Sequence, residues 1–104
     1  MEKVYQALEL ANKTGSLKRG TNEVTKAIEK GTAKLVAYAA DVSPKEIIMH
    51  LPLLCKDKSI PCYEVPNKEE LGAAAGLSRG TAAVAIIEAG DSADLIKELG
   101  NKSE

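Results

Sequence analysis

Three short apolar runs, separated by segments with helical periodicity, constrain the fold of this chain more than any other feature of its sequence. They read KLVAYAA, PCYEVP and AAVAII and cover residues 34–40, 61–66 and 82–87. Short apolar runs are suited to buried strands. Strands that alternate with helices form a parallel or mixed sheet covered by helices on both faces. The sequence therefore predicts an α/β fold, a three-layer α/β/α sandwich with a small mixed sheet.

Helix start and stop signals predict two helices before the first strand. Residues 3–13 place apolar side chains at helical spacing, and Gly15 follows as a stop. Thr21 or Asn22 is the expected N-cap of the second helix, and Gly31 is its C-cap. The segment between these helices is short and basic, and no strand is predicted there.

Three more helices follow. Ser43, Pro44 and Glu46 form the N-terminal signature of the third helix, in which Ser43 is the cap. Pro52 lies inside its pattern, so we expect a bend or a restart near Leu51. Asn67 is the expected cap of the fourth helix, with Glu70 as its capping-box partner, and Gly76 is its expected stop. Asp91 or Ser92 is the expected cap of the last helix, residues 93–99, and Gly100 is its expected stop.

The length and composition indicate one soluble domain. A chain of 104 residues and 11.0 kDa can bury a core of its own, so residues 1–104 are predicted to form a single domain. No apolar run approaches the roughly 18 residues of a membrane span. The N-terminal MEKVYQALELA lacks the features of a secretory signal. These observations predict a cytoplasmic protein with no membrane association.

The charge is unevenly distributed, although the net charge is only −1. Between Lys13 and Lys34, basic residues outnumber acidic ones by six to two, and the rest of the chain is acidic. A local basic patch on an acidic body steers a polyanion to one place.

The sequence favours neither a metal centre nor a cofactor site. Cys55, Cys62 and His50 are the only cysteines and the only histidine, and they are too few for a zinc site without carboxylates. Both cysteines are expected to be reduced and buried as small hydrophobes.

The second predicted helix, within GTNEVTKAIEKG, has an unusual polar face. At 100° per residue, Asn22, Glu23, Lys26 and Lys30 share one side, and the apolar residues take the other. An amide, a carboxylate and two ammonium groups can hydrogen-bond base edges as well as phosphates. The pattern alone also fits an ordinary solvated face with Asn22 as a cap.

A resemblance to a known family favours the first interpretation. GTNEVTKAIEKG, LVAYAADVSPKEIIMHLPLLCKDKSIP and VPNKEELGAAAGLSRGTAAVAII occur in that order. The chain thereby resembles the family of the archaeal large-subunit ribosomal protein "seven-Ae" and its kink-turn-binding relatives. A kink turn is an internal RNA bend whose sheared G·A pairs expose guanine edges in a widened groove.

The resemblance implies particular roles for individual residues. Asn22, Glu23 and Lys26 would read the guanines, while other residues would approach the RNA backbone or cover a base that is flipped out of the bend. Arg19, Gly20 and Lys30 would approach the RNA backbone. Leu77 and Ile47 would pack on the flipped base. Ser78 and Arg79 would contact the exposed RNA strand.

The resemblance also implies the partners. They would be kink turns of ribosomal RNA, of box C/D and H/ACA guide RNAs and of ribonuclease P RNA, together with the scaffold protein of the guide particles. The free protein is expected to be a monomer without enzymatic activity.

Two other functions remain open from the sequence. GLSRG, residues 76–80, matches the nucleophile-elbow pattern, which would make Ser78 the nucleophile of a hydrolase. The elbow needs a strand before it and a helix after it, whereas the reverse order is predicted here, and His50 is expected to be a helix residue with a satisfied ring nitrogen. The second alternative is a protein-interaction member of the same sandwich fold without an RNA role.

Overall fold

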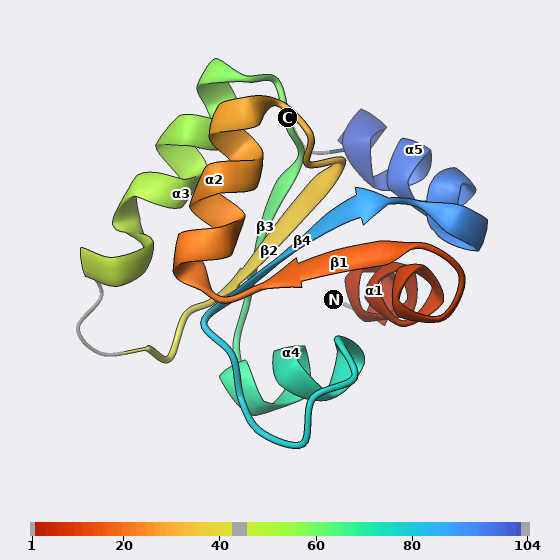
Figure 1. Cartoon of the computed structure of the whole chain (residues 1–104), viewed down its shortest axis with the longest axis horizontal. Helices are drawn as coiled ribbons and strands as arrows, with labels where there is room; N and C mark the ends of the chain where they lie inside the picture. The colour runs from red at the N-terminus through yellow and green to blue at the C-terminus, as the bar shows by residue number, and fades with distance from the viewer. Residues whose placement is uncertain (1, 43–45, 103–104) are drawn as a thin grey trace.

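The computed structural model describes residues 2–42 and 46–102, which form the three predicted layers (Figure 1). The elements, in order, are α1 (Glu2–Thr14), β1 (Ser16–Arg19), α2 (Thr21–Lys30), β2 (Leu35–Ala39), α3 (Glu46–Asp57), β3 (Cys62–Val65), α4 (Lys68–Ala74), β4 (Ala83–Glu88), the 3-10 turn Gly90–Ser92 and α5 (Ala93–Lys102). Helices α2 and α3 cover one face of the sheet, and α1 and α4 cover the other, with α5 packed beside α1. The prediction of an α/β/α sandwich is confirmed.

The sheet is mixed, as predicted, in the order β1-β4-β2-β3. Strand β4 runs antiparallel to both β1 and β2, whereas β2 and β3 are parallel. The central strands explain the apolar runs in the sequence, because Leu35, Val36, Val84 and Ile86 are fully buried between the two helical layers. The three predicted strands are therefore confirmed: those at 34–40 and 61–66 are slightly shorter than predicted, and the one at 82–87 is shifted by one residue.

Strand β1 was not predicted. Its four residues pair with β4, but only Leu17 is buried, and Lys18 is exposed. An edge strand with one buried side chain leaves no apolar run in the sequence, so hydrophobic periodicity does not detect it. The strand leads directly into α2.

The N-terminus of α2 differs from the prediction, and its C-terminus agrees with it. The N-cap is Gly20, with φ of 95°, and no side chain caps the helix. Neither Thr21 nor Asn22 therefore has the expected capping role. Gly31 closes the helix in the left-handed conformation, with φ of 74°, as predicted for a glycine C-cap.

Two other predicted helix signals differ from the structure. Helix α3 continues from Glu46 to Asp57 through Pro52, so the helix does not restart near Leu51, and the alternative of a bend there stays a prediction. Helix α5 continues past Gly100 to Lys102 and is preceded by a 3-10 turn, in which the hydroxyl of Ser92 donates to the carbonyl of Ala89. The proposed cap at Ser43 and Pro44 lies outside the described residues.

The cap of α4 is partly as predicted. The Asn67 Oδ1 atom accepts hydrogen bonds from the amides of Glu69 and Glu70 at 2.8 and 3.0 Å. The Glu70 carboxylate, however, accepts from the Tyr5 hydroxyl at 3.2 Å instead of reaching back to the cap. This bond joins α4 to α1.

Over the part of the chain that is described, no helix is long and apolar enough to cross a membrane. The same residues contain no cluster of three or more histidine, cysteine, aspartate or glutamate side chains that could hold a metal ion.

Candidate nucleic-acid interface

Helix α2 is amphipathic in the way that its sequence predicts. Val24, Ala27 and Ile28 are buried against the sheet and α3. The four polar residues of the predicted binding face, Asn22, Glu23, Lys26 and Lys30, are all exposed. Among the described residues, the Glu23 carboxylate has no hydrogen-bond or ion-pair partner, so it is available to a ligand.

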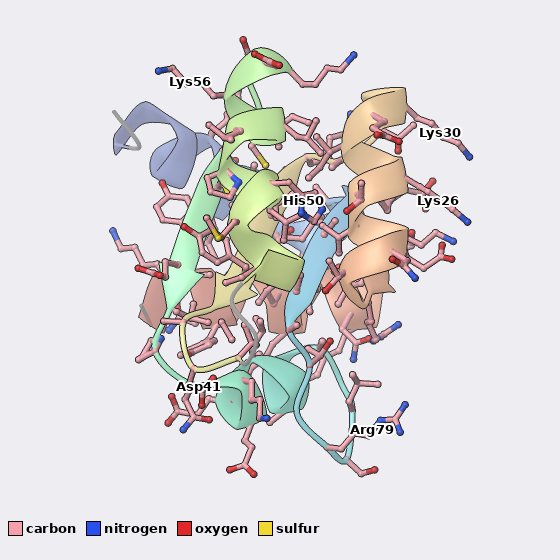
Figure 2. The ribbon with its side chains drawn as sticks, turned by 90° about the vertical axis from the view of Figure 1, so that its left-hand side faces the viewer. Lys26, Lys30, Asp41, His50, Lys56 and Arg79 are labelled. Carbon is pink, nitrogen blue, oxygen red and sulfur yellow. The ribbon has the colours of Figure 1, made fainter. Side chains whose placement is uncertain are left out.

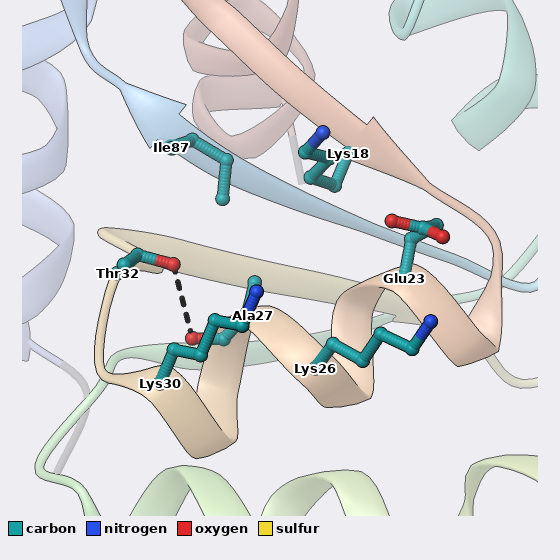
Figure 3. A pocket seen from close by; sticks show the side chains of 7 residues that line it. All are labelled: Lys18, Glu23, Lys26, Ala27, Lys30, Thr32 and Ile87. Atoms are coloured by element: carbon teal, nitrogen blue, oxygen red, sulfur yellow. Dashed lines mark hydrogen bonds between the residues drawn. The ribbon is translucent and has the colours of Figure 1, made fainter.

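A pocket of about 210 Å³ lies between this face and the sheet (Figure 3). Glu23, Lys26 and Lys30 line it from α2, while Lys18 of β1 and Ile87 of β4 lie across from the helix. Its remaining lining residues are Ala27 and Thr32, which are joined by a hydrogen bond from the threonine hydroxyl to the alanine carbonyl. Three ammonium groups and one carboxylate give the pocket a positive balance, which attracts a polyanion.

The first turn of α2 adds to this positive potential. The Gly20 amide donates to the Ala83 carbonyl at 2.9 Å, and no side chain caps the helix amides that follow. Uncapped amides at a helix N-terminus point outward and attract anions. No atom lies within 4 Å of where a Cβ of Gly20 would stand, so the space beside this turn is open.

The loop after α4 forms a second candidate contact region. Leu77 is half-buried, whereas Ser78 and Arg79 are exposed, and all three line a pocket of about 340 Å³ with Glu69, Ala73 and Gly80. Figure 2 shows Lys26, Lys30 and Arg79 along the same edge of the molecule, with Arg79 in the loop beyond the start of α2. The structure thus brings two separate predicted groups to one side.

Two other predicted site residues, Arg19 and Ile47, are not shown as exposed side chains that are free to contact a ligand. The guanidinium of Arg19 already makes hydrogen bonds within the protein, from Nε to the Ala75 carbonyl at 2.8 Å and from Nη2 to Asn12 Oδ1 at 2.6 Å. Ile47 lies in α3, but its side chain is outside the described part of the structure.

Four residues that line the pocket were not predicted as site residues, and one of them, Ala27, was predicted for the packed side of α2 instead. The other three, Lys18, Thr32 and Ile87, reach the pocket from β1, the α2–β2 loop and β4. The only sequence signal for Lys18 was the local excess of basic residues, and Thr32 and Ile87 had none. Such neighbours are found only once the strand order is known.

The geometry does not support a hydrolase site at Ser78. The GLSRG segment follows helix α4 and precedes strand β4, which is the reverse of a nucleophile elbow. His50 Nε2 lies 2.7 Å from the Thr25 hydroxyl, and this bond joins α3 to α2. The expectation of a helix residue with a satisfied ring nitrogen is confirmed. Figure 2 shows where His50 lies on α3.

The two cysteines lie against each other. Cys55 is buried, as predicted, but Cys62 is only partly buried and packs on the edge of the core. A hydrogen bond from the Cys62 thiol lowers the pKa of Cys55, and the same bond, together with burial, raises the pKa of Cys62. Both sulfur atoms are free thiols.

Replacing both cysteines with alanine is expected to leave unchanged the RNA affinity that the family resemblance implies, because neither side chain lines the pocket on α2 or the pocket at the α4–β4 loop. The measurement is a titration of labelled RNA with the refolded double variant, after circular dichroism has shown an unchanged fold. A large loss of affinity in the folded variant would contradict a purely structural role.

The sequence of this sandwich places the chain in a known family. The sequence matches the ribosomal protein L7Ae/L30e/S12e/Gadd45 family over residues 2–96. Because the match spans nearly the whole chain, the protein belongs to this family. A solved structure described as Giardia lamblia 15.5kD RNA binding protein is similar, with 32% sequence identity and a TM-score of 0.92 over 98% of this chain and 85% of that one.

Proposed function

We propose that this protein binds kink-turn RNA, with the exposed face of α2 as its principal contact. The observation that carries the proposal is the joint exposure of Asn22, Glu23 and Lys26 beside an uncapped helix N-terminus. Membership of a family of ribosomal proteins and the likeness to an RNA-binding protein of known structure support it.

The chemistry of this face suits base edges in a widened groove. Asn22 can both donate and accept, Lys26 donates to a base carbonyl oxygen, and Glu23 accepts from base amino or imino groups. A carboxylate would only repel phosphates, so its place among lysines is explained if it faces a base. We assign these three residues to the guanines of the sheared G·A pairs.

The surrounding residues would hold the RNA backbone and the flipped base. Lys30 and Lys18 line the positive pocket next to Glu23, and Gly20 leaves open space for a backbone to approach. In the loop after α4, half-buried Leu77 would cover one face of an extruded base, and Ile47 would pack against the same base. The remaining contacts, to the exposed strand, are assigned to Ser78 and Arg79.

The biological setting follows from the family resemblance. Kink turns of large-subunit ribosomal RNA, of box C/D and H/ACA guide RNAs and of ribonuclease P RNA are the proposed targets. In guide particles, the bound protein and RNA would together present a surface to a scaffold protein. The free protein is proposed to act as a monomer and as a non-enzymatic RNA binder.

A gel shift with the wild-type protein tests this function. The probes are one RNA with a kink turn and one fully paired duplex of the same length, at two salt concentrations. We expect a discrete complex with the kinked RNA at concentrations that leave the duplex unbound. Equal binding to both would indicate non-specific phosphate attraction, and no binding to either would favour the protein-interaction alternative.

A further inference from the structure

Arg19 connects three segments that are distant in the sequence. It is the last residue of β1 and immediately precedes Gly20, the N-cap of α2. Its Nε donates to the carbonyl of Ala75 at the C-terminus of α4, and its Nη2 donates to Oδ1 of Asn12 on α1. One guanidinium therefore ties the start of α2 to the end of α4 and to α1.

These bonds are favourable for a clear physical reason. The last carbonyls of a helix have no partner within the helix and carry partial negative charge. The Ala75 carbonyl, at the C-cap of α4, is such a group, and its residue is fully buried. Arg19 gives it a charge-assisted hydrogen bond, which is stronger than a neutral one.

The loop that follows α4 is fixed on that helix. The Leu77 amide donates to the Gly72 carbonyl at 2.9 Å, and the Thr81 amide donates to the Lys68 carbonyl at 3.1 Å. Gly72 also packs directly on the Arg79 carbonyl. Because the loop is bonded to α4 at several points, the position of the end of α4 sets the position of the loop.

Asn12 supports the same segment from the other side. A Cβ on Gly76 would lie 2.5 Å from the Asn12 Nδ2 atom, so the amide of Asn12 packs against Gly76. Gly76 has φ of 83°, a left-handed conformation that starts the turn into Leu77. Arg19 and Asn12 together thus hold residues 75 and 76.

We infer that Arg19 is a positioning residue that sets the Leu77–Arg79 loop relative to the first turn of α2, rather than a phosphate ligand. The inference rests on the proposed function, in which these two regions contact the same RNA. Two acceptors on different helices match the planar fork of arginine, whose Nε and Nη2 donors point in fixed directions. A lysine ammonium at this position would keep the positive charge but could not make both hydrogen bonds in this geometry.

The test compares Arg19→Lys and Arg19→Ala with Lys18→Ala, which removes an exposed basic side chain from the adjacent position of β1. The first readout needs no RNA and is hydrogen exchange of the Leu77 amide in the free protein. We expect exchange about tenfold faster in both Arg19 variants, because the charge-assisted bond that holds the end of α4 is lost. Exchange in Lys18→Ala should match the wild type.

The second readout is the salt dependence of kink-turn binding. We expect both Arg19 variants to lose about three- to tenfold in affinity with an unchanged slope of log K against log salt, because no phosphate contact is removed. Lys18→Ala should instead reduce the slope by about one unit. Wild-type exchange and affinity in Arg19→Lys, or a reduced slope in either Arg19 variant, would overturn the inference.

The two readouts also separate this inference from the proposed function. If the wild-type protein does not distinguish the kinked RNA from the duplex, the proposed function fails, whereas the exchange of Leu77 still reports whether Arg19 holds the loop. Arg19→Lys keeps the charge and most of the aliphatic stem, so it serves as the deciding variant if Arg19→Ala does not fold.

Discussion

Replacing Glu23 with alanine is expected to weaken kink-turn binding by about 1–3 kcal/mol, the range for loss of one base-edge contact. The side chain is exposed on α2 and, among the described residues, has no partner within the protein, so the fold should not change. The loss comes from a base donor that is left without its acceptor in the complex. Calorimetric titration with a kink-turn RNA measures it directly.

Glu29→Ala is the matched control, because Glu29 is also an exposed glutamate of α2 but does not line the pocket. This variant changes the net charge by the same amount and should bind kink-turn RNA with nearly wild-type affinity. Similar losses in both variants would show that the effect of Glu23 is one of helix stability or overall charge. The role assigned to Glu23 would then be wrong.

Replacing Gly72 of α4 with alanine is expected to disrupt the packing of the α4–β4 loop on this helix. A Cβ at this buried position would overlap the carbonyl oxygen of Arg79, which belongs to the backbone and cannot rotate away. Overpacking of this kind costs about 1–3 kcal/mol, and the overlap with backbone places this case at the upper end. The better helix propensity of alanine offsets only about 1 kcal/mol. Urea unfolding should therefore show a net loss of about 2 kcal/mol.

Gly80→Ala provides the comparison for this prediction. Its Cβ would lie 3.1 Å from Cγ of Lys68 and 3.3 Å from the carbon and oxygen of the Lys68 carbonyl, which are tight contacts that a shift of a few tenths of an ångström relieves. The free energy of unfolding should change by less than about 1 kcal/mol. If Gly72→Ala is as stable as Gly80→Ala and binds RNA normally, the close packing of the loop on α4 has no energetic consequence.

The fold could be predicted where burial leaves a repeating signal in the sequence. The central strands read as apolar runs because helices cover both of their faces, and Val24, Ala27 and Ile28 mark the packed side of α2 at helical spacing. Strand β1 has one buried residue and left no such signal. Gly20 was not predicted as the N-cap, because an open helix start with no side-chain cap departs from the usual preference for a polar cap.

From periodicity alone, the candidate site was predictable only where its residues lie on α2, whereas the residues of the Leu77–Arg79 loop were implied by the family resemblance. The face of α2 follows from 100° per residue, and the structure confirms that its polar residues are exposed together. Lys18 and Ile87 reach the same pocket from other strands, which no local pattern reveals. The contacts of Arg19 with Asn12 and Ala75 depend on tertiary packing across 7 and 56 positions of the chain, so no local pattern indicated them, and the resemblance implied only an approach to the RNA backbone.

The sign of the effect of Glu23→Ala on two RNAs tests the central claim most directly, namely that α2 reads base edges. If the face reads bases, affinity for the kink-turn RNA falls, while affinity for a straight duplex of the same length stays the same or rises slightly, because a carboxylate that repels phosphates has been removed. Both affinities should be measured in one buffer at one salt concentration with the same protein preparation. A rise in affinity for both RNAs, or an equal fall for both, would contradict base reading by this helix.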